Sequence, residues 1–323
     1  MPRFQILSLT GGGYLGLYTA CVLAALEDRA GEPLGRRFDL IAGTSIGGIL
    51  ALALAYEVPM AAVRDAFAER GREIFSDRDV PRSRLQRLRR SWKGIAAPRY
   101  SPTPLARLIE EFLGQATLGA AKHPALVPAV NLSRGETRLF RTPHHPAHAA
   151  DGAVRALDAA MATAAAPLFF PLARHRGDLY MDAGVYADCP DALALHEAEH
   201  FLEQRREDVA MLSIGTMTAG FAVPPATRAE IGALAWMAKR RMIYTVLSAQ
   251  QHLSRTLMAE SLGERFLRID RDNPESTWEI IDLDVAGPNA VRTLLGIGAE
   301  AAADVRARAD VAPFLAHRAA PRD

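Results

Sequence analysis

The sequence predicts a single α/β domain with a largely parallel central sheet. Short apolar runs typical of buried strands alternate with longer helical segments along the whole 323-residue chain. No internal repeat, low-complexity linker or change of composition marks a boundary between two domains. The length is sufficient for one large domain with a substantial core. We therefore expect a domain over residues 1–315 and a frayed tail over residues 316–323.

The first part of the chain is predicted to form two strand–helix units. Residues 3–9 (RFQILSL) have the pattern of a buried strand, and a glycine-rich turn then begins a helix over residues 11–30. Residues 38–45 form the second predicted strand, which a mostly buried helix follows over residues 46–57. An amphipathic helix with a proline near its start is expected over residues 59–75.

The alternation of strands and helices continues to the C-terminus. The expected elements are a hairpin over 125–143 with its turn at Arg134-Gly135, a helix of small residues over 153–166, a strand and turn over 178–190, a helix from about Asp191, a strand over 208–216, a long helical segment over 229–262, strands over 265–270 and 278–284, and a final helix over 288–309.

The composition argues against several classes of protein. Hydrophobic residues make up 49% of the chain, charged residues 23%, and the formal net charge is +1, so the chain has no general attraction to nucleic acid. Two cysteines, Cys21 and Cys189, are too few for a disulfide framework and suit a reducing compartment. No secretory signal is visible, and the longest apolar run, residues 49–56, is far below the ~18 residues that a membrane span needs. We expect a cytoplasmic protein whose membrane contact is peripheral.

One segment departs from this balance of charge. Residues 82–93 (RSRLQRLRRSWK) carry six cations and no acid. A solvated segment without fixed structure is the interpretation that the composition favours. A basic patch that meets anionic lipid headgroups stays open as the alternative.

The motif Gly43-Thr44-Ser45-Ile46-Gly47 is a G-x-S-x-G between a predicted strand and a predicted helix. In this context the motif is typical of a nucleophile elbow, in which a sharp turn presents one serine hydroxyl. The flanking glycines are needed because side chains would clash in so tight a turn. Ser45 would lie at a helix N-terminus, where the dipole favours developing negative charge. We interpret Ser45 as a candidate nucleophile.

Residues Gly11–Gly16 (GGGYLG) form a second glycine cluster, which also fits the G-x-G-x-x-G of dinucleotide-binding folds. That fold requires an acid at the end of the next strand, whereas Asp39 lies at the start of that strand. The exposed amides of this loop are better suited to an oxyanion hole, which binds the negative oxygen of a tetrahedral intermediate.

The third cluster is Asp182-Ala183-Gly184, which follows a predicted strand. A nucleophilic serine needs a base, and a carboxylate within hydrogen-bonding reach can serve. Taken alone, Asp-Ala-Gly is a common turn sequence.

Histidine is not expected to complete a catalytic triad. Only one strand–helix unit precedes Ser45, unlike the α/β-hydrolases, in which several strands come before the nucleophile. His196 and His200 have the i, i+4 spacing of a metal-binding pair, but no third ligand is evident beside them, and a surface position is favoured. The histidines are His123, His144, His145, His148, His175, His196, His200, His252 and His317.

With these three clusters the chain resembles the patatin-like phospholipase family over most of its length. That family combines a Gly-Gly-Gly-x-Arg-Gly loop, a G-x-S-x-G elbow and a later Asp-Gly-Gly or Asp-Gly-Ala. The counterparts here, in the same order, are Gly11–Gly16, Gly43–Gly47 and Asp182–Gly184. Residues 161–171 (MATAAAPLFFP) and 211–216 (MLSIGT) are similar to two further stretches of the family.

The resemblance implies a three-layer domain with helices on both faces of the sheet and a serine lipid acyl hydrolase of the phospholipase A type. Ser45 would be the nucleophile and Asp182 the general base of a Ser–Asp dyad that works through an acyl-enzyme. The amides of Gly11, Gly12 and Gly13 would form the oxyanion hole. The resemblance implies no metal, no organic cofactor and no nucleic acid partner, and it makes the surface of a phospholipid membrane the substrate.

Three positions depart from the family pattern. Leu15 stands where the family usually has a basic residue, so any role of that cation in orienting groups is missing. Ala183 replaces a glycine, which would be strained if the backbone there were left-handed. Asp188 lies where the family usually has an Asn-x-Pro sequence and places another carboxylate near the site. The motif glycines Gly16 and Gly184 are retained, as are Gly43 and Gly47.

Bacterial members of this family include antiviral phospholipases that cyclic oligonucleotides activate. The compact length of the chain and the helical segment over residues 231–262 resemble those effectors. This likeness implies a cyclic di- or trinucleotide activator and a role in defence against phages. The sequence shows no nucleotide pocket and leaves open whether the chain forms a homo-oligomer.

Two other functions stay open. The departures at Leu15 and Ala183 are compatible with a catalytically silent protein that binds lipids or acts as a scaffold. The loop Gly11–Gly16 leaves open a dinucleotide-dependent enzyme, which the position of Asp39 disfavours.

Overall fold

The computed structural model describes most of the chain. The described residues are 4–75, 97–218, 241–273 and 280–320, with the single positions 222, 229, 230, 232, 236 and 277. The basic segment 82–93 and most of residues 219–240 lie outside them.

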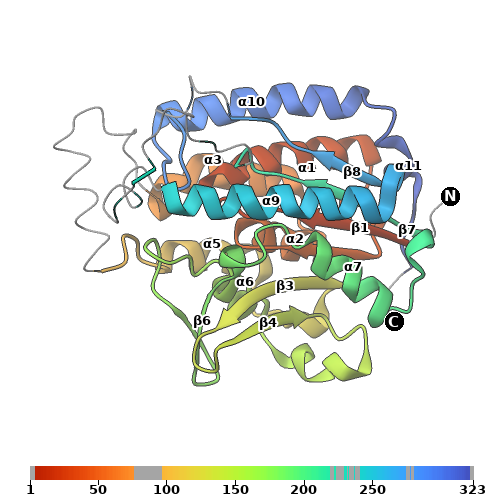
Figure 1. Ribbon diagram of the computed structural model, residues 1–323, viewed down its shortest axis with the longest axis horizontal. Coiled ribbons are helices and arrows are strands. Elements are labelled where there is room, and N and C mark those ends of the chain that lie inside the picture. Colours follow the sequence, from red (N-terminus) through yellow and green to blue (C-terminus); the bar gives the residue numbers. More distant parts are fainter. Residues whose placement is uncertain are drawn as a thin grey trace.

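One mixed sheet forms the centre of the domain (Figure 1). The strand order is β5-β6-β3-β2-β1-β7-β8, and β4 pairs with β3. The pairs from β3 through β2, β1 and β7 to β8 are parallel, whereas β4, β5 and β6 pair antiparallel. The strands are β1 (Phe4–Leu9), β2 (Leu40–Gly43), β3 (Ala125–Asn131), β4 (Glu136–Arg141), β5 (Ala173–His175), β6 (Asp178–Asp182), β7 (Val209–Ile214) and β8 (Phe266–Ile269). The expected parallel sheet is thus confirmed at its centre.

Helices cover both faces of this sheet, as expected for a three-layer fold (Figure 1). Along β1, Leu7 and Leu9 join a core with α1, α2, α3 and α10, while Phe4 and Ile6 join a second core with α7 and the end of α9. This division follows from the two-residue period of a strand. The helices are α1 (Gly16–Ala30), α2 (Ile46–Ala55), α3 (Met60–Ile74), α5 (Thr103–Leu113), α6 (Ala156–Thr163), α7 (Asp191–His200), α9 (Arg241–Leu262), α10 (Pro288–Ala307) and α11 (Ala312–Ala316).

The late strand expected over residues 278–284 is wrong for its described positions, 280–284, which form turn and irregular structure. The Leu283 carbonyl accepts a hydrogen bond from the Tyr14 amide at 2.8 Å. The Asp284 carboxylate pairs with Arg99 at 3.2 Å. The first contact holds the segment against the glycine loop and the second holds it against Arg99, and the segment does not add a strand to the sheet.

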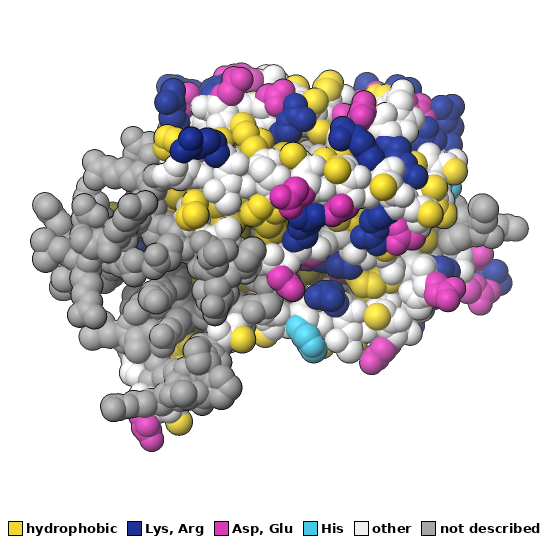
Figure 2. Space-filling model, turned by 90° about the horizontal axis from the view of Figure 1, so that it is seen from above, with side chains coloured by type: hydrophobic (Ala, Val, Ile, Leu, Met, Phe, Trp, Pro, Cys, Tyr) yellow, Lys and Arg dark blue, Asp and Glu magenta, His cyan; other side chains and the backbone are white. Residues whose placement is uncertain are grey.

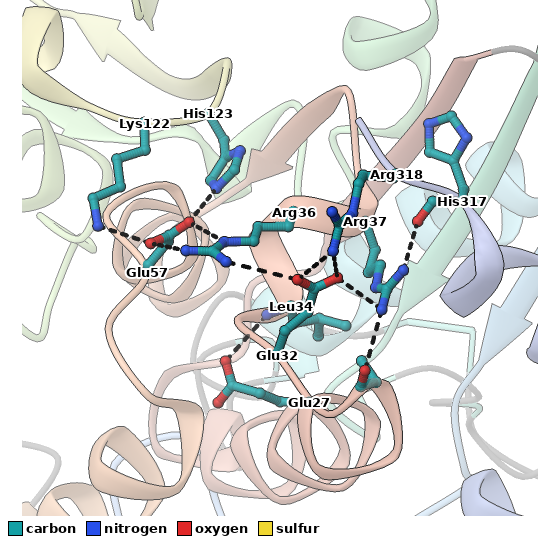
Figure 3. Close-up of polar contacts among 11 residues, drawn as sticks. Glu27, Glu32, Leu34, Arg36, Arg37, Glu57, Lys122, His123, His317 and Arg318 are labelled. Carbon is teal, nitrogen blue, oxygen red and sulfur yellow. Dashed lines mark hydrogen bonds and ion pairs between the residues drawn. The ribbon is translucent and has the colours of Figure 1, made fainter. Parts of the chain in front are cut away.

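The described part of the C-terminal tail lies against the body of the domain, with hydrogen bonds as far as Ala319. Figure 3 shows Arg318 beside Glu32, with two contacts of 2.9 and 3.0 Å, and Arg37 donating to the His317 carbonyl at 3.1 Å. The Ala319 amide also donates to the Arg36 carbonyl at 2.9 Å.

Charges of both signs are mixed over the surface. Figure 2 shows basic, acidic and hydrophobic side chains interspersed on the face seen from above. On α10, Glu300 and Asp304 both pair with Arg271. Among the described residues, no helix combines the length and the apolar character that crossing a membrane requires.

Candidate active site

Ser45 lies in a strained turn between β2 and α2. Its backbone has φ 56° and ψ −124°, a conformation that is rare for any residue other than glycine. A Cβ atom at Gly43 would lie 2.0 Å from the Gly47 carbonyl oxygen, and one at Gly47 would lie 2.3 Å from the Leu9 carbonyl oxygen. The Ser45 amide donates to Thr163 Oγ1 at 2.9 Å. The turn therefore has room only for glycine at positions 43 and 47, and its geometry is that of a nucleophile elbow.

The glycine loop follows β1 and lies beside this turn. Gly12 has φ 153° and Gly13 has φ 56°, and both line the same cavity as Ser45. A Cβ atom at Gly12 would lie 2.3 Å from Thr216 Oγ1. Within the part of the chain that the structure describes, the amides of Gly12 and Gly13 donate to no protein acceptor. They are therefore free to bind a developing oxyanion.

The Gly11 amide differs from its two neighbours and from the expectation for it. It donates to the Asp188 carbonyl at 2.9 Å, so it has no hydrogen left for an oxyanion. The Gly11 carbonyl accepts a hydrogen bond from Thr216 Oγ1. Gly11 thus helps to hold the loop in place, and the amides of Gly12 and Gly13 stay the candidates for an oxyanion hole.

Asp182 is brought to Ser45 by the register of the sheet. β2 ends at Gly43, one residue beyond the pairing of Ala42 with Leu126 on β3. Further along β3, Ala129 pairs with Asp182 on β6. The end of β6 therefore lies beside the chain just past β2, and both Ser45 and Asp182 line one cavity.

Asp182 is 4% exposed, and its carboxyl accepts a hydrogen bond from the Gly184 amide at 2.7 Å. Burial raises the pKa of Asp182 to about 6, and the hydrogen bonds from the Ser45 hydroxyl and the Gly184 amide act in the opposite direction. A carboxylate with a pKa close to neutral, hydrogen-bonded to a serine, is suited to accept the serine proton.

The two departures from the family pattern beside these residues are both accommodated. Ala183 belongs to the short 3-10 helix Ala183–Val185 and is not among the residues with positive φ, so its side chain causes no backbone strain. Leu15 is fully buried in the apolar core, where a cation would lack solvation. Neither position supports the idea of a decayed site.

Asp188 is a second buried carboxylate in the cavity. Its Oδ2 accepts a hydrogen bond from Gln251 Nε2 at 2.8 Å, and burial raises its pKa to about 7. Gln250 accepts from the Asp188 amide and donates to the Gly184 carbonyl, each at 2.9 Å. Helix α9 therefore holds both ends of the turn between Gly184 and Asp188. Nothing in the sequence singles out these two glutamines.

The cavity has a volume of about 430 Å³ and an almost entirely apolar wall. Its polar groups are concentrated around Ser45, Asp182 and Asp188, together with the amides of Gly12 and Gly13. An apolar chamber that ends at a serine hydroxyl and a carboxylate suits an acyl chain with its ester at the polar end. The apolar lining includes Ile46, Ile49, Phe67, Phe75, Leu105, Phe169, Phe170, Leu247 and Leu283.

The other candidate groups lie elsewhere. None of the nine histidines, all within the described ranges, lines this cavity. Asp39 precedes β2 and accepts hydrogen bonds from the Gln5 amide and His317 Nε2, both at 2.7 Å. It therefore lies at the opposite end of β2 from the glycine loop, which is the wrong end for a dinucleotide site.

Comparisons with known proteins give a consistent result. The model of the family described as patatin-like phospholipase matches residues 7–195. This stretch contains the glycine loop, the elbow and Asp182.

Several bacterial relatives match nearly the whole chain. A protein of Pseudomonas aeruginosa named cGAMP-activated phospholipase is 39% identical over 99% of this chain and 94% of its own length. A protein of the same name from Vibrio cholerae is 34% identical over 94% of this chain and 91% of its own length. The mouse calcium-independent phospholipase A2-gamma is 28% identical over 60% of this chain but only 26% of its own length.

Proposed function

Because the chain belongs to the patatin-like phospholipase family and is a lipid ester hydrolase, we propose that Ser45 and Asp182 carry out the hydrolysis of phospholipid acyl esters. The observation that carries this proposal is that a strained, half-buried serine and a carboxyl of raised pKa meet at the polar end of one apolar cavity.

In the first half of the reaction, Ser45 Oγ attacks the acyl carbonyl carbon while Asp182 takes the hydroxyl proton. The amides of Gly12 and Gly13 bind the oxyanion of the tetrahedral intermediate, where such donors are worth about 10²–10³ in rate. The intermediate then breaks its bond to the leaving alkoxide, which receives the proton from Asp182. The products of this half are a lysophospholipid and a fatty acid ester of Ser45.

The second half reverses these roles with water as the nucleophile. Asp182, ionised again, takes a proton from water, and the resulting hydroxide attacks the acyl carbon on Ser45. A second oxyanion forms in the same hole, and its collapse returns the proton to Ser45 Oγ. The fatty acid leaves and the free enzyme is restored.

A fluorophosphonate probe tests the nucleophile directly. We expect the probe to label the native chain and not the Ser45→Ala variant. Ser8→Ala is a matched control, because Ser8 is fully buried and its hydroxyl has no hydrogen-bond partner, so its loss leaves the site intact. Labelling of Ser45→Ala at the native rate would disprove the assignment.

Exposed apolar side chains of the cavity support a membrane as the source of substrate. Leu168, Val185, Met242 and Val246 all line the cavity, yet each is 38% to 56% exposed. We propose that these side chains enter the lipid surface, so that an acyl chain passes from bilayer to cavity without crossing water.

A paired substitution separates membrane docking from catalysis. Val185→Asp with Met242→Asp should lower the hydrolysis of phospholipid vesicles much more than that of a soluble short-chain ester. Leu132→Asp provides the control, since Leu132 is 42% exposed but lies outside the cavity. An equal loss on both substrates would indicate damage to the site itself.

We also propose that a cyclic dinucleotide activates the chain. The support comes from the relatives of Pseudomonas aeruginosa and Vibrio cholerae, which are named cGAMP-activated phospholipases and align over more than 90% of this chain. Analysis of the lipid products from mixed phospholipid vesicles, with and without cGAMP and other cyclic di- and trinucleotides, tests this. Equal release of fatty acid in all samples would refute activation. A response to cGAMP would also support a place in anti-phage defence.

A further inference from the structure

Five of the nine histidines gather away from the cavity, where the segment after β4 meets the end of α7. His145, His148, His196 and His200 all lie around the ring of Phe201, with ring centroids 4.5 to 6.1 Å away. His144 stacks edge-on against His148 at 5.8 Å. The sequence separates these residues into two groups about 50 positions apart, and the fold brings the groups together.

Three side chains of this cluster point at one another. His144 Nε2 lies 3.0 Å and His148 Nε2 lies 3.2 Å from the same oxygen, Glu197 Oε1. The three ligand atoms lie within 4.8 Å of one another, and the side chains are only 2%, 7% and 0% exposed. Tetrahedral zinc with bonds of about 2.0–2.1 Å separates its ligand atoms by about 3.3 Å. The two nitrogen–oxygen distances, 3.0 and 3.2 Å, are close to this value.

One unpartnered nitrogen shows that hydrogen bonding alone leaves the cluster incomplete. His148 Nε2 is buried and lacks a hydrogen-bond partner, although it faces Glu197. A cation placed among the three groups would satisfy the buried lone pairs.

The surroundings already orient the ligands. His144 Nδ1 lies 2.8 Å from Thr142 Oγ1, a contact that directs Nε2 towards Glu197 and is typical of metal-bound histidine. Arg141 Nε donates to the other oxygen, Glu197 Oε2, at 2.8 Å. This leaves Oε1 available to a cation.

We propose that His144, His148 and Glu197 bind one Zn²⁺ ion. Two imidazoles and one carboxylate are a ligand set that zinc accepts, with water in the fourth position. The ion would tie the segment that follows β4 to helix α7. This inference stands apart from the proposed hydrolysis, because none of the three residues lines the cavity.

Calorimetric titration of the metal-depleted full chain with ZnCl₂ tests the site. We expect about one ion per chain and a rise in the unfolding temperature that a chelator reverses. His148→Gln should weaken zinc binding at least about 100-fold, because it removes a direct ligand. The matched control is the double variant His196→Gln with His200→Gln, since these exposed rings stack on each other at 5.2 Å within the same cluster but lie outside the proposed ligand set.

Each result of these titrations has its own meaning, and none of them depends on a measurement of enzymatic activity. Loss of zinc binding in the His196/His200 variant, with retention in His148→Gln, would place the ion on the surface pair and overturn the proposal. Absence of stoichiometric binding to the native chain would also overturn it. Should His148→Gln fail to fold, titration of the unaltered chain with Co²⁺ gives the answer. Tetrahedral coordination then produces strong visible absorption, and its absence contradicts the site.

Discussion

The pKa of Asp182 leads to a quantitative prediction for the pH dependence of hydrolysis. As the proposed base, Asp182 must be ionised to accept the Ser45 proton, and burial raises its pKa to about 6. The ionised fraction is then about 9% at pH 5 and about 99% at pH 8. We expect kcat/KM to rise about tenfold between these two values. A soluble short-chain ester is the suitable substrate, because its hydrolysis does not depend on how membrane binding changes with pH.

Replacement of the two carboxyls identifies which of them controls this profile. Asp182→Asn should lower kcat/KM by orders of magnitude, because an amide does not accept the proton. Asp188→Asn is the matched control, since Asp188 is also buried in the cavity and has a raised pKa of about 7. The rise near pH 6 should persist in Asp188→Asn. If it vanished there and Asp182→Asn remained active, Asp188 would be the base.

The same raised pKa predicts an effect on stability. The folded state holds the Asp182 proton more tightly than the unfolded state, so this residue's contribution to the free energy of unfolding decreases as pH rises from about 4 to 6. Above that range the ionised carboxyl lowers the free energy of unfolding by up to about 3 kcal/mol. This figure follows from the difference between the pKa of about 6 and the usual value of 3.8. Asp182→Asn should therefore unfold at higher urea concentration at pH 8. A native profile that is flat between pH 5 and 8, together with a less stable Asp182→Asn, would refute the reasoning.

Three other substitutions test the supports of the site and the core. Gly12→Ala should lower ester hydrolysis at least about 100-fold with an unchanged circular dichroism spectrum. The added Cβ would lie 2.3 Å from Thr216 Oγ1 and would therefore displace the loop amides. Activity near the native value would contradict this prediction. Gln251→Leu removes the hydrogen bond to the buried Asp188 carboxyl. The free energy of unfolding in urea should therefore decrease by about 2 kcal/mol. An unchanged free energy of unfolding would show that the contact is dispensable. Gly298→Ala places a Cβ 2.7 Å from the Cys21 thiol on α1. We expect the free energy of unfolding to fall by about 1–3 kcal/mol with unchanged kcat. A loss of activity without a loss of stability would be inconsistent with a packing role.

Much of the site could be predicted because its chemistry depends on neighbours in the sequence. The elbow at Ser45 needs glycine on both sides, and the structure shows why, since a Cβ atom at either position would meet backbone. The strand before it and the helix after it are local patterns of apolar residues. The hairpin of β3 and β4 was likewise predictable from two apolar runs around Arg134-Gly135.

Other features could not be predicted because they arise between distant segments. The amide of Gly11 is equivalent to those of Gly12 and Gly13 in the sequence, and only its contact with the Asp188 carbonyl sets it apart. Residues 280–284 have the alternation of a strand, but their contact with Tyr14 overrides that preference. The antiparallel pairing of β6 with β3 is equally non-local, and it is what places Asp182 near Ser45.

The sequence by itself determined the class of fold and the elbow around Ser45, since each depends on short-range periodicity or on turn chemistry, whereas only the resemblance to a known family singled out Asp182. Tertiary structure alone decided which amides are free, how far burial raises the pKa of Asp182, that Gln250 and Gln251 hold the turn before Asp188, and that His144 and His148 face Glu197. Burial and hydrogen-bond pairing depend on everything that packs around a group, and those neighbours come from the whole length of the chain.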